Sequence, residues 1–511
     1  MTANRLRVVL LKPSKYGTDG YVERFHRGFM PNSTVPYLRS MTPASFEGAA
    51  IEIHAIDEYV QTDLDYLKLL EMNNYPTLLA LVGVQSHQFQ RSLDLAAYAR
   101  AHGVNHCVIG GPHPMTCDTS MLHNRGVSFA LAEAEIIWLQ ILHDAIRGEL
   151  APVYGQEQRW QQILDAPVLI PPNARDLRRY FLPMIGIYPA RGCPFTCNFC
   201  SVIKIAGRRI RTQNVETTIA SLRAVKAAGV ELVMFTSDNF NKYAEAPELL
   251  QRMIEEKVGV PFFVQCDTQV ANQEEFIELL GRAGCFQMFV GVESFSRKTL
   301  LAAHKAQNHP EMYGKIVKLC REQRISTQFS NIIGFPNDTV ESIREQVGIL
   351  RELSPDFASF YILTPVPGTQ QYDDFQQAGW ISEANLDRFD GTTTTWRHDK
   401  LELRELRRLL FWCYQRFYSS RHMLDSTLKG VRANGILSGL ASGLAQLLSR
   451  LSAWRGRHPM SGGIGIVRRD HARDYARLRR SYYGYDLVPL PSSLQLSAAD
   501  EALNRNVRLA L

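Results

Sequence analysis

RGCPFTCNFC, residues 191–200, is the stretch of this 511-residue chain that decides its fold. It holds three of the nine cysteines, Cys193, Cys197 and Cys200. Thiolates are soft ligands that suit zinc or an iron–sulfur cluster. A closed structural zinc site needs four ligands, but the next cysteine along the chain is Cys266. Three thiolates on a cubane leave one iron open, so we expect a cluster, with zinc as the alternative.

The cysteines follow the first of six regularly spaced apolar runs. The runs are typical of buried parallel strands, and amphipathic stretches with helical periodicity lie between them. Strands are predicted at 185–190, 231–237, 261–267, 287–293, 326–335 and 358–363, and helices at 215–228, 245–257, 273–283, 308–323 and 338–353. This α/β pattern predicts a full or partial parallel (β/α) barrel over residues 181–380. Barrel enzymes keep their chemistry on the loops at the carboxyl ends of the strands.

The first 150 residues show a second series of the same kind. Strands are predicted at 6–13, 51–57, 77–84, 106–111 and 127–132, and helices at 88–102 and 133–147. Strands without polar alternation are buried on both faces of a parallel sheet. We therefore predict a doubly wound, Rossmann-like domain over residues 1–150, joined to the barrel by a linker at 151–180. Such sheets bind ligands at the carboxyl ends of their strands.

Residues 381–511 are predicted to be a helical region with a basic tail. Nine arginines and two aspartates between Arg450 and Arg480 give this stretch a charge of +7, whereas the whole chain carries +6. The other residues are therefore close to neutral. This distribution indicates a local basic patch rather than a general surface for polyanions, and we expect no DNA partner.

One stretch of this region, 433–449, has no charged residue. Its glycines Gly435, Gly439 and Gly443 are four residues apart, which makes one helix face smooth. We interpret it as a buried amphipathic helix packed tightly on the barrel. A peripheral membrane contact through residues 427–457 is the alternative, because basic residues flank the segment.

Composition places the chain among globular proteins. Hydrophobic residues make up 45% and charged residues 21% of it, which argues against disorder. Its first apolar run, Leu6–Leu11, ends at Lys12 and is too short for a secretory leader. No apolar run is long enough for a spanning helix, and nine cysteines are too few for a disulfide scaffold. We expect a cytoplasmic protein with reduced thiols.

The cysteine motif resembles the CxxxCxΦC signature of the radical S-adenosylmethionine (radical SAM) superfamily, with Phe199 as the aromatic residue Φ. The resemblance implies a [4Fe–4S] cluster on the three cysteines, with SAM chelating the open iron. An electron supplied by an external donor of flavodoxin or ferredoxin type would cleave SAM to a 5′-deoxyadenosyl radical. The resemblance places Phe199, Asp238 and Glu293 in the SAM site, since the latter two end strands two and four of the barrel.

Four basic residues follow the motif: Lys204, Arg208, Arg209 and Arg211. They are interpreted either as a solvated approach to a helix or as functional cations. In the second case Arg209 or Arg211 would meet the SAM carboxylate or the anionic cluster. Both interpretations stay open.

Three segments of the N-terminal domain, VGVQSHQF (82–89), CVIGGPHPMT (107–116) and FALAEAE (129–135), follow its third, fourth and fifth strands. They resemble the cobalamin-binding domain of cobalamin-dependent radical SAM enzymes, which carries GGxHxT and GExE-like segments at these places. Ala132 replaces the usual glycine. The resemblance implies that cobalamin contacts Gln85, Ser86, Gly110, Gly111, His113 and Glu133.

The DxHxxG motif, which supplies a histidine to cobalt in many cobalamin proteins, is absent. The chain reads KPSKYG after its first strand. A lone histidine in a loop is more often a hydrogen-bonding residue than a metal ligand. We therefore interpret His87 and His113 as hydrogen-bonding residues, and the lower axial ligand of cobalamin stays unassigned.

These features together predict a cobalamin-dependent radical SAM enzyme that methylates an unactivated carbon of a small or lipid-like substrate, through the 5′-deoxyadenosyl radical and methylcobalamin. The segment 401–424 resembles the branch that includes the hopanoid methylase and the Mg-protoporphyrin ester cyclase. No general base is assigned. One alternative is a cobalamin-linked cyclase or rearrangement enzyme. Another is a radical SAM enzyme without cobalamin, such as a tRNA methylthiotransferase, although Cys107 and Cys117 alone are insufficient for its second cluster.

Overall fold

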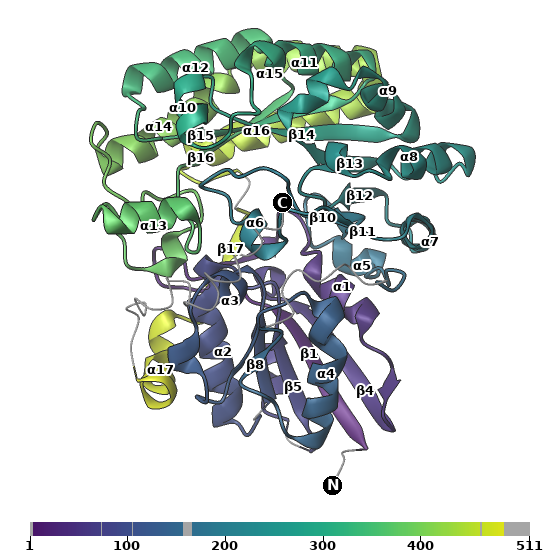
Figure 1. Ribbon diagram of the computed structural model, residues 1–511, viewed down its shortest axis with the longest axis vertical. Helices are drawn as coiled ribbons and strands as arrows, with labels where there is room; N and C mark the ends of the chain where they lie inside the picture. Colours follow the sequence, from purple (N-terminus) through teal and green to yellow (C-terminus); the bar gives the residue numbers. More distant parts are fainter. Residues whose placement is uncertain (1–3, 73, 105, 157–165, 460–461, 485–511) are drawn as a thin grey trace.

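The computed structural model describes residues 4–72, 74–104, 106–156, 166–459 and 462–484 (Figure 1). Two parallel sheets dominate this part of the chain. In Figure 1 the N-terminal sheet lies below and the sheet with the higher-numbered strands lies above it. The predicted division into a doubly wound sheet and a parallel barrel sheet is confirmed.

The N-terminal sheet has seven strands in the order β3-β4-β1-β5-β6-β7-β8. Their bounds are β1 Arg5–Lys12, β3 Ser45–Phe46, β4 Ala49–Asp57, β5 Thr77–Leu81, β6 His106–Gly110, β7 Ser128–Ala130 and β8 Val153–Tyr154. All pairs except β3–β4 are parallel. The strand order reverses between β1 and β5, and doubly wound sheets bind ligands at such a point. The five predicted strands are present, whereas the short edge strands β3 and β8 were not predicted.

Helices cover both faces of this sheet because its strands are apolar on both sides. The helices α1 (Thr34–Met41) and α4 (Ala134–Arg147) pack on one face, and α2 (Phe89–Ala101) packs on the other. The apolar residues of α4 recur every three or four positions, which gives the helix one buried face. It ends at Gly148, whose φ of 78° lies in the left-handed region that glycine tolerates.

The second sheet has six parallel strands in the order β9-β12-β13-β14-β15-β16. Their bounds are β9 Met184–Ile187, β12 Leu232–Phe235, β13 Phe262–Cys266, β14 Cys285–Glu293, β15 Ser326–Ile333 and β16 Phe357–Ile362. The intervening helices are α7 Val215–Ala227, α8 Ala246–Glu255, α9 Glu274–Ala283, α11 Tyr313–Glu322 and α12 Val340–Leu353. All six strands and five helices were predicted. In the described part of the chain β9 and β16 do not pair, so the barrel is partial.

Shorter elements lie on the loops. They are β10 Ala190–Arg191, β11 Arg211–Thr212, α3 Pro112–Thr116, α5 Ala174–Leu177, α6 Val202–Ile205, α10 Arg297–Ala302 and α13 Gln370–Gln377. Towards the C-terminus follow α14 Leu403–Phe417, α15 Ser420–Asn434, α16 Ile436–Trp454, β17 Ile464–Val467 and α17 Ala476–Tyr483. The C-terminal region is mainly helical, as predicted, but it also contains β17.

Segments from both ends of the chain fill the gap between β9 and β16. The amide of Phe181 donates to the Gly28 carbonyl at 2.8 Å, and the amide of Leu182 donates to Phe29 at 2.8 Å, just before β9. Next to this segment, β2 (Arg24–Arg27) pairs antiparallel with β17. On the other side His458 Nε2 lies 2.7 Å from the Phe360 carbonyl of β16. The C-terminal region therefore completes the barrel wall.

The helix predicted in the uncharged stretch forms as α16, but the prediction that it is buried was wrong. Gly439, Gln446 and Ala453 are its buried residues among those whose side chains are described. Leu437 is 86% exposed and Trp454 is 72% exposed. The apolar periodicity predicts a helix face, but only tertiary structure decides whether another element covers that face. None of the described helices is both long enough and apolar enough to span a bilayer.

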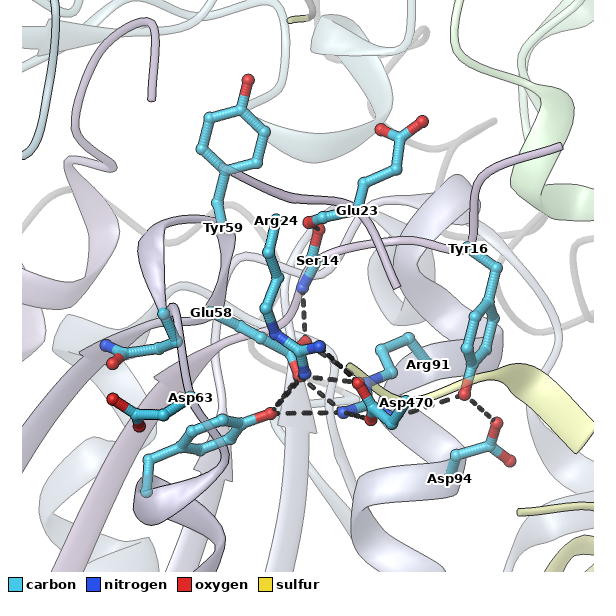
Figure 2. A network of polar contacts seen from close by, with 12 residues as sticks. Ser14, Tyr16, Glu23, Arg24, Glu58, Tyr59, Asp63, Arg91, Asp94 and Asp470 are labelled. Atoms are coloured by element: carbon cyan, nitrogen blue, oxygen red, sulfur yellow. Dashed lines mark hydrogen bonds and ion pairs between the residues drawn. The ribbon is translucent and has the colours of Figure 1, made fainter. Parts of the chain in front are cut away.

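The basic tail is tied to the N-terminal domain by buried ion pairs. Figure 2 shows the carboxylates of Glu58 and Asp470 beside the guanidinium groups of Arg24 and Arg91. Arg91 Nη2 lies 2.6 Å from Glu58 and 2.9 Å from Asp470. Although burial disfavours its charge, Arg91 and Arg24 hold the pKa of the Asp470 carboxyl well below its usual range. Near them, Arg479 of α17 donates to Asp94 of α2 at 2.6 Å.

We expect Asp470→Asn to lower the free energy of unfolding at pH 7 by about 3 kcal/mol, because it leaves two buried arginines short of one negative charge. The lowered pKa of Asp470 stabilises the folded protein at pH values above the ordinary pKa of an aspartate, which is about 4. The loss of stability in the variant should therefore shrink as the pH falls below about 4. Chemical denaturation of the full chain at pH 7 and at lower pH measures the loss of stability and its dependence on pH. The matched control is Asp19→Asn. Asp19 pairs with Arg468 at an exposed site, so this substitution should cost less than about 1 kcal/mol. Equal losses in the two variants would contradict this account.

Candidate active site at the domain boundary

The loops at the carboxyl ends of the two sheets face each other. Glu133, directly before α4, accepts from Arg211 of β11 at 2.7 Å, and Arg191 of β10 pairs with Glu135 at 2.7 Å. Thr116 of α3 lies against the loop after β16, where its hydroxyl is 3.5 Å from the Pro367 carbonyl. Residues at the mouths of both sheets therefore share one space.

The cysteine loop connects β10 to α6. The amide of Cys193 donates to the Gly207 carbonyl at 3.2 Å, and the amide of Cys200 donates to Cys197 at 3.2 Å. Side-chain amides contact two of the sulfurs: Asn239 Nδ2 lies 2.9 Å from Cys193 Sγ, and Gln307 Nε2 lies 3.6 Å from Cys197 Sγ. All nine cysteines of the chain are free thiols.

Burial keeps these thiols protonated in the protein alone. It raises the pKa of Cys193 to about 11 and that of Cys200 to about 12. The positive charge of Lys305 opposes the effect of burial on the pKa of all three cysteines but does not cancel it. Metal binding requires thiolates and displaces their protons. The loop is thus an apolar setting in which bound iron would supply the missing positive charge.

In the described part of the chain, no group of three or more His, Cys, Asp or Glu side chains is placed to hold a metal ion. A mononuclear zinc site requires its ligands to converge on one ion. In a cubane each thiolate binds a different iron, so the sulfurs stand further apart. The described side chains are therefore not gathered around a closed mononuclear zinc site.

Two of the residues expected around SAM meet at a buried lysine. Glu293 ends β14 with a φ of 61°, and its Oε1 lies 2.7 Å from Lys305 Nζ. The same ammonium lies 5.7 Å from the centre of the Phe199 ring. A Cβ at position 291 would lie 2.6 Å from the Glu293 carboxylate, so a larger residue there would displace the Glu293 side chain. Lys305 was not found from the sequence, because no motif marks it.

Asp238, the third of these residues, supports the backbone of the cysteine loop. Its Oδ2 accepts from the amide of Gly192 at 2.8 Å. Burial raises the pKa of Asp238, against the opposing effects of this hydrogen bond and of Arg191. Asn239, which contacts Cys193, is the next residue in the FTSDNF segment and could have been found there.

The residues expected around cobalamin surround the ends of β5 and β6. Ser86 Oγ lies 3.1 Å from His113 Nδ1, and the His113 ring stacks on Phe89 at 3.9 Å. Burial lowers the pKa of His113 to about 3, so the ring is neutral. Gly111 has a φ of 133°, and a Cβ there would lie 2.2 Å from the backbone nitrogen of Val84. Gln85 is exposed and begins a short 3-10 helix through reciprocal hydrogen bonds with Gln88.

A cavity of about 300 Å³ lies at the same boundary. Small residues line its N-terminal side: Gly83, Gly110, Gly111, Ala130 and Ala132. Arg191, Thr236 and Asp238 line it from the barrel side. Glu133 also lines it, although its carboxylate is engaged by Arg211. Larger side chains, Tyr37, Trp138 and Tyr188 among them, line the rest of the cavity.

The basic residues after the cysteine motif have different surroundings. Arg211 joins the two domains through Glu133 rather than facing the thiols. Arg208 donates to the Pro194 carbonyl at 3.0 Å and so supports the loop. Arg209 is exposed, and Lys204 is buried.

Residues 187–347, which contain the three cysteines and most of the barrel, match the radical SAM superfamily. This segment of the chain is a radical SAM domain. The family predicted from the CxxxCxΦC motif is therefore confirmed.

Two relatives of this radical SAM protein come from Chlorobaculum tepidum. A bacteriochlorophyllide d C-12(1)-methyltransferase is 27% identical over 296 residues, which are 55% of this chain and 62% of the relative. A bacteriochlorophyllide d C-8(2)-methyltransferase is 24% identical over 445 residues, which are 83% of this chain and 93% of the relative. The chain therefore matches less than two thirds of the first relative and nearly all of the second.

A solved structure shares the whole fold. The cobalamin-dependent S-adenosylmethionine radical enzyme OxsB with aqua-cobalamin bound superposes with a TM-score of 0.58 at 13% identity, covering 99% of this chain and 81% of that one. At this identity the similarity concerns the fold alone. It includes the order of a doubly wound domain, a barrel and a helical C-terminal region.

We expect Gly192→Ala to lose most of the iron that the wild-type protein takes up. Its φ of 107° suits only glycine, and the added Cβ would lie 2.4 Å from the Arg209 carbonyl oxygen, so the loop has to move. Iron and sulfide per chain after anaerobic reconstitution measure the loss. Gly229→Ala is the matched control, because position 229 also has a positive φ but open space around it. Full iron loading of Gly192→Ala would show that the loop geometry does not hold the metal.

Proposed function

We propose that this protein is a cobalamin-dependent radical SAM methyltransferase that methylates an unactivated carbon. The observation that supports this most is that residues flanking the cysteine loop, Arg191 and Ala206, line the cavity at the domain boundary, next to ion pairs that join one domain to the other. The names of both Chlorobaculum tepidum relatives as methyltransferases agree with this proposal.

The proposed cofactors are a [4Fe–4S] cluster, SAM and cobalamin. Cys193, Cys197 and Cys200 would hold the cluster, and Phe199, Asp238 and Glu293 would surround SAM. When bound, the cluster and SAM supply a radical that removes hydrogen, and cobalamin supplies the methyl group.

Cobalamin would occupy the small-residue cavity next to Gly110 and Gly111. The neutral His113 ring lies outside the lining of this cavity, buried in the fold, hydrogen-bonded to Ser86 and packed against Phe89. Glu133, which lines the cavity, and Gln85, which is exposed and lies outside the lining, would complete the contacts. The proposal assigns no histidine to cobalt.

The protein's own residues position the reactants and exclude water. Lys305 is held by Glu293 and balances negative charge at the cysteine loop. Asp238 and Asn239 orient the loop and one of its sulfurs. Side chains from both sheets enclose the shared space, which protects a reactive carbon radical from solvent.

The remaining parts of the proposal concern partners and location. The substrate is a small or lipid-like molecule, and the electron comes from an external donor of flavodoxin or ferredoxin type. The free thiols suit a reducing cytoplasm. The functional units are residues 1–150 for cobalamin, 181–380 for radical chemistry, a linker at 151–180 and a C-terminal region at 381–511.

Anaerobic reconstitution with iron, sulfide and hydroxocobalamin tests the proposal. We expect about four irons per chain, the loading of one cubane, together with about one corrinoid. Metal analysis measures the iron, and the absorption spectrum measures the bound corrinoid. A cluster that forms without corrinoid uptake would overturn the methyltransferase proposal. Products of turnover then separate methylation from cyclisation, because only methylation adds a methyl group derived from SAM.

We expect Cys197→Ala to abolish reductive SAM cleavage while the chain stays folded. The variant removes one of three thiolates and leaves a small side chain in a buried position. Release of 5′-deoxyadenosine under dithionite measures cleavage, and circular dichroism measures folding. Cys107→Ala is the matched control, because Cys107 is equally a buried thiol but belongs to the core of the N-terminal domain. Wild-type cleavage by Cys197→Ala would refute the cluster assignment.

We also propose a peripheral membrane contact through residues 427–457. The exposed apolar residues of α16 form one continuous surface: Ile436, Leu437, Leu440, Leu444, Leu447, Leu451 and Trp454. Residues 426–469 carry seven lysines and arginines and no acidic residue. An apolar helix face flanked by cations suits the interface of a membrane that contains acidic lipid.

We expect the protein to sediment with vesicles of phosphatidylcholine and phosphatidylglycerol, and less with phosphatidylcholine alone. The double variant Leu437→Glu, Leu444→Glu should bind at least about tenfold more weakly, because two charges replace apolar contacts at the interface. Leu301→Glu is the control, since Leu301 is an exposed leucine on α10, outside this surface. Equal sedimentation of all three proteins would refute the contact.

A further inference from the structure

A second and larger cavity lies inside the barrel, away from the cysteine loop. Its volume is about 480 Å³. Residues from the amino-terminal halves of the barrel strands line it, including Phe263, Phe289 and Phe357. Glu293, at the proposed SAM site, lies four residues beyond Phe289 on the same strand, past a register shift at Gly291, so the two are separated by at most about 13 Å. The cavity therefore opens into the barrel below the proposed reaction centre.

The body of this cavity is apolar, with a few uncharged polar groups. Gln287 Nε2 donates to Gln328 Oε1 at 2.9 Å, so these two amides satisfy one another in part. For the third glutamine of the lining, Gln265, the described part of the chain provides no hydrogen-bond partner. The hydroxyls of Tyr414 and Tyr418 bond to backbone groups of β16. A ligand here would be mostly hydrocarbon with at most an occasional polar group.

The residues that close the barrel gap also form the outer wall of the cavity. They come from 27–30 next to β9, from α16 and from the segment that leads into β17. Ala445 and Leu448 of α16 face the cavity, whereas Leu437 and Leu444 of the same helix are exposed. The helix thus lies between the cavity and the surface that we propose to contact a membrane, and the two meet at Leu451, which belongs to both.

The rim of the cavity has a single sign of charge. Arg27, Arg455 and Arg457 line it, and none of the lining residues is an aspartate or glutamate. All three arginines are exposed. Arg27 makes one hydrogen bond, to the Tyr180 carbonyl at 3.2 Å, and the described residues offer the guanidinium groups of Arg455 and Arg457 no acidic partner. Three such cations would attract a carboxylate or phosphate at the mouth.

We propose that the barrel cavity binds an amphiphile, with its apolar body inside the barrel and its anionic head group at Arg27, Arg455 and Arg457. On the proposed function this amphiphile is the substrate, and a carbon of its body is the one that is methylated. A body longer than about 13 Å brings such a carbon from the level of Phe289 to that of Glu293. The anionic head stays at the surface, where water and arginines solvate it.

Calorimetric titration of the cofactor-loaded full chain with abietic acid, a tricyclic carboxylic acid, tests this binding mode. We expect one molecule to bind per chain, and its methyl ester to bind at least about tenfold more weakly, because the ester has the same body without the charge. The double variant Arg455→Gln, Arg457→Gln, which retains Arg27, should bind the acid more weakly than the wild-type protein does and so narrow the difference between acid and ester. Acid and ester of equal affinity for the wild-type protein would overturn the proposal.

Ala445→Trp tests the location, because the indole would fill the cavity. It should weaken binding of the acid at least about tenfold, whereas Ala441→Trp, the same change at an exposed position of the same helix, should not. Circular dichroism and thermal unfolding compare the two variants, and the exposed arginine pair provides a test that does not disturb the core. Unchanged affinity in a folded Ala445→Trp protein would overturn the proposal.

Release of 5′-deoxyadenosine without ligand is measured on the same samples and separates this inference from the proposed function. Intact SAM cleavage and corrinoid uptake without binding of the acid would overturn the cavity assignment alone. Binding of the acid by a protein that neither cleaves SAM nor takes up corrinoid would overturn the proposed function alone.

Discussion

The chemistry proposed for this protein depends on the ion pairs that join its two sheets. Glu133 and Glu135 follow a strand of the N-terminal sheet, and Arg211 and Arg191 flank the cysteine loop of the barrel. These side chains are largely withdrawn from water, so each charge needs its partner and the pairs define one orientation. A loop with three thiols and a cavity lined by small residues thereby face the same space. Without this coupling each domain would present half of a site.

The barrel itself is incomplete without segments from the two ends of the chain. Six strands leave a gap between β9 and β16, and β2, residues 28–29, β17 and His458 fill it. The buried charges of Glu58, Asp470 and their arginines fasten the C-terminal region to the N-terminal domain (Figure 2). The tail is therefore part of the enclosure, and only some of its arginines remain available for a ligand.

The helix α16 contributes side chains both to the wall of the barrel cavity and to the exposed apolar surface. A Cβ at Gly439 would lie 2.4 Å from the backbone of Val431, so glycine permits α15 and α16 to pack closely. On one side of α16 Ala445 and Leu448 line the barrel cavity, and on another side leucines are exposed. An apolar ligand and an apolar surface would then be separated by one helix. This arrangement suits a substrate that partitions between a membrane and the enzyme.

The sequence by itself determined the local features of this protein. The spacing of Cys193, Cys197 and Cys200, the unalternating apolar runs and the amphipathic stretches between them predict the cysteine loop and the strands and helices of both parallel sheets, because each depends on near neighbours in the chain. Tertiary structure alone decided that Lys305 meets Glu293, that Arg211 pairs with Glu133 and that the leucines of α16 stay uncovered. These contacts join residues far apart in sequence, and side-chain periodicity reveals a face but not what lies against it.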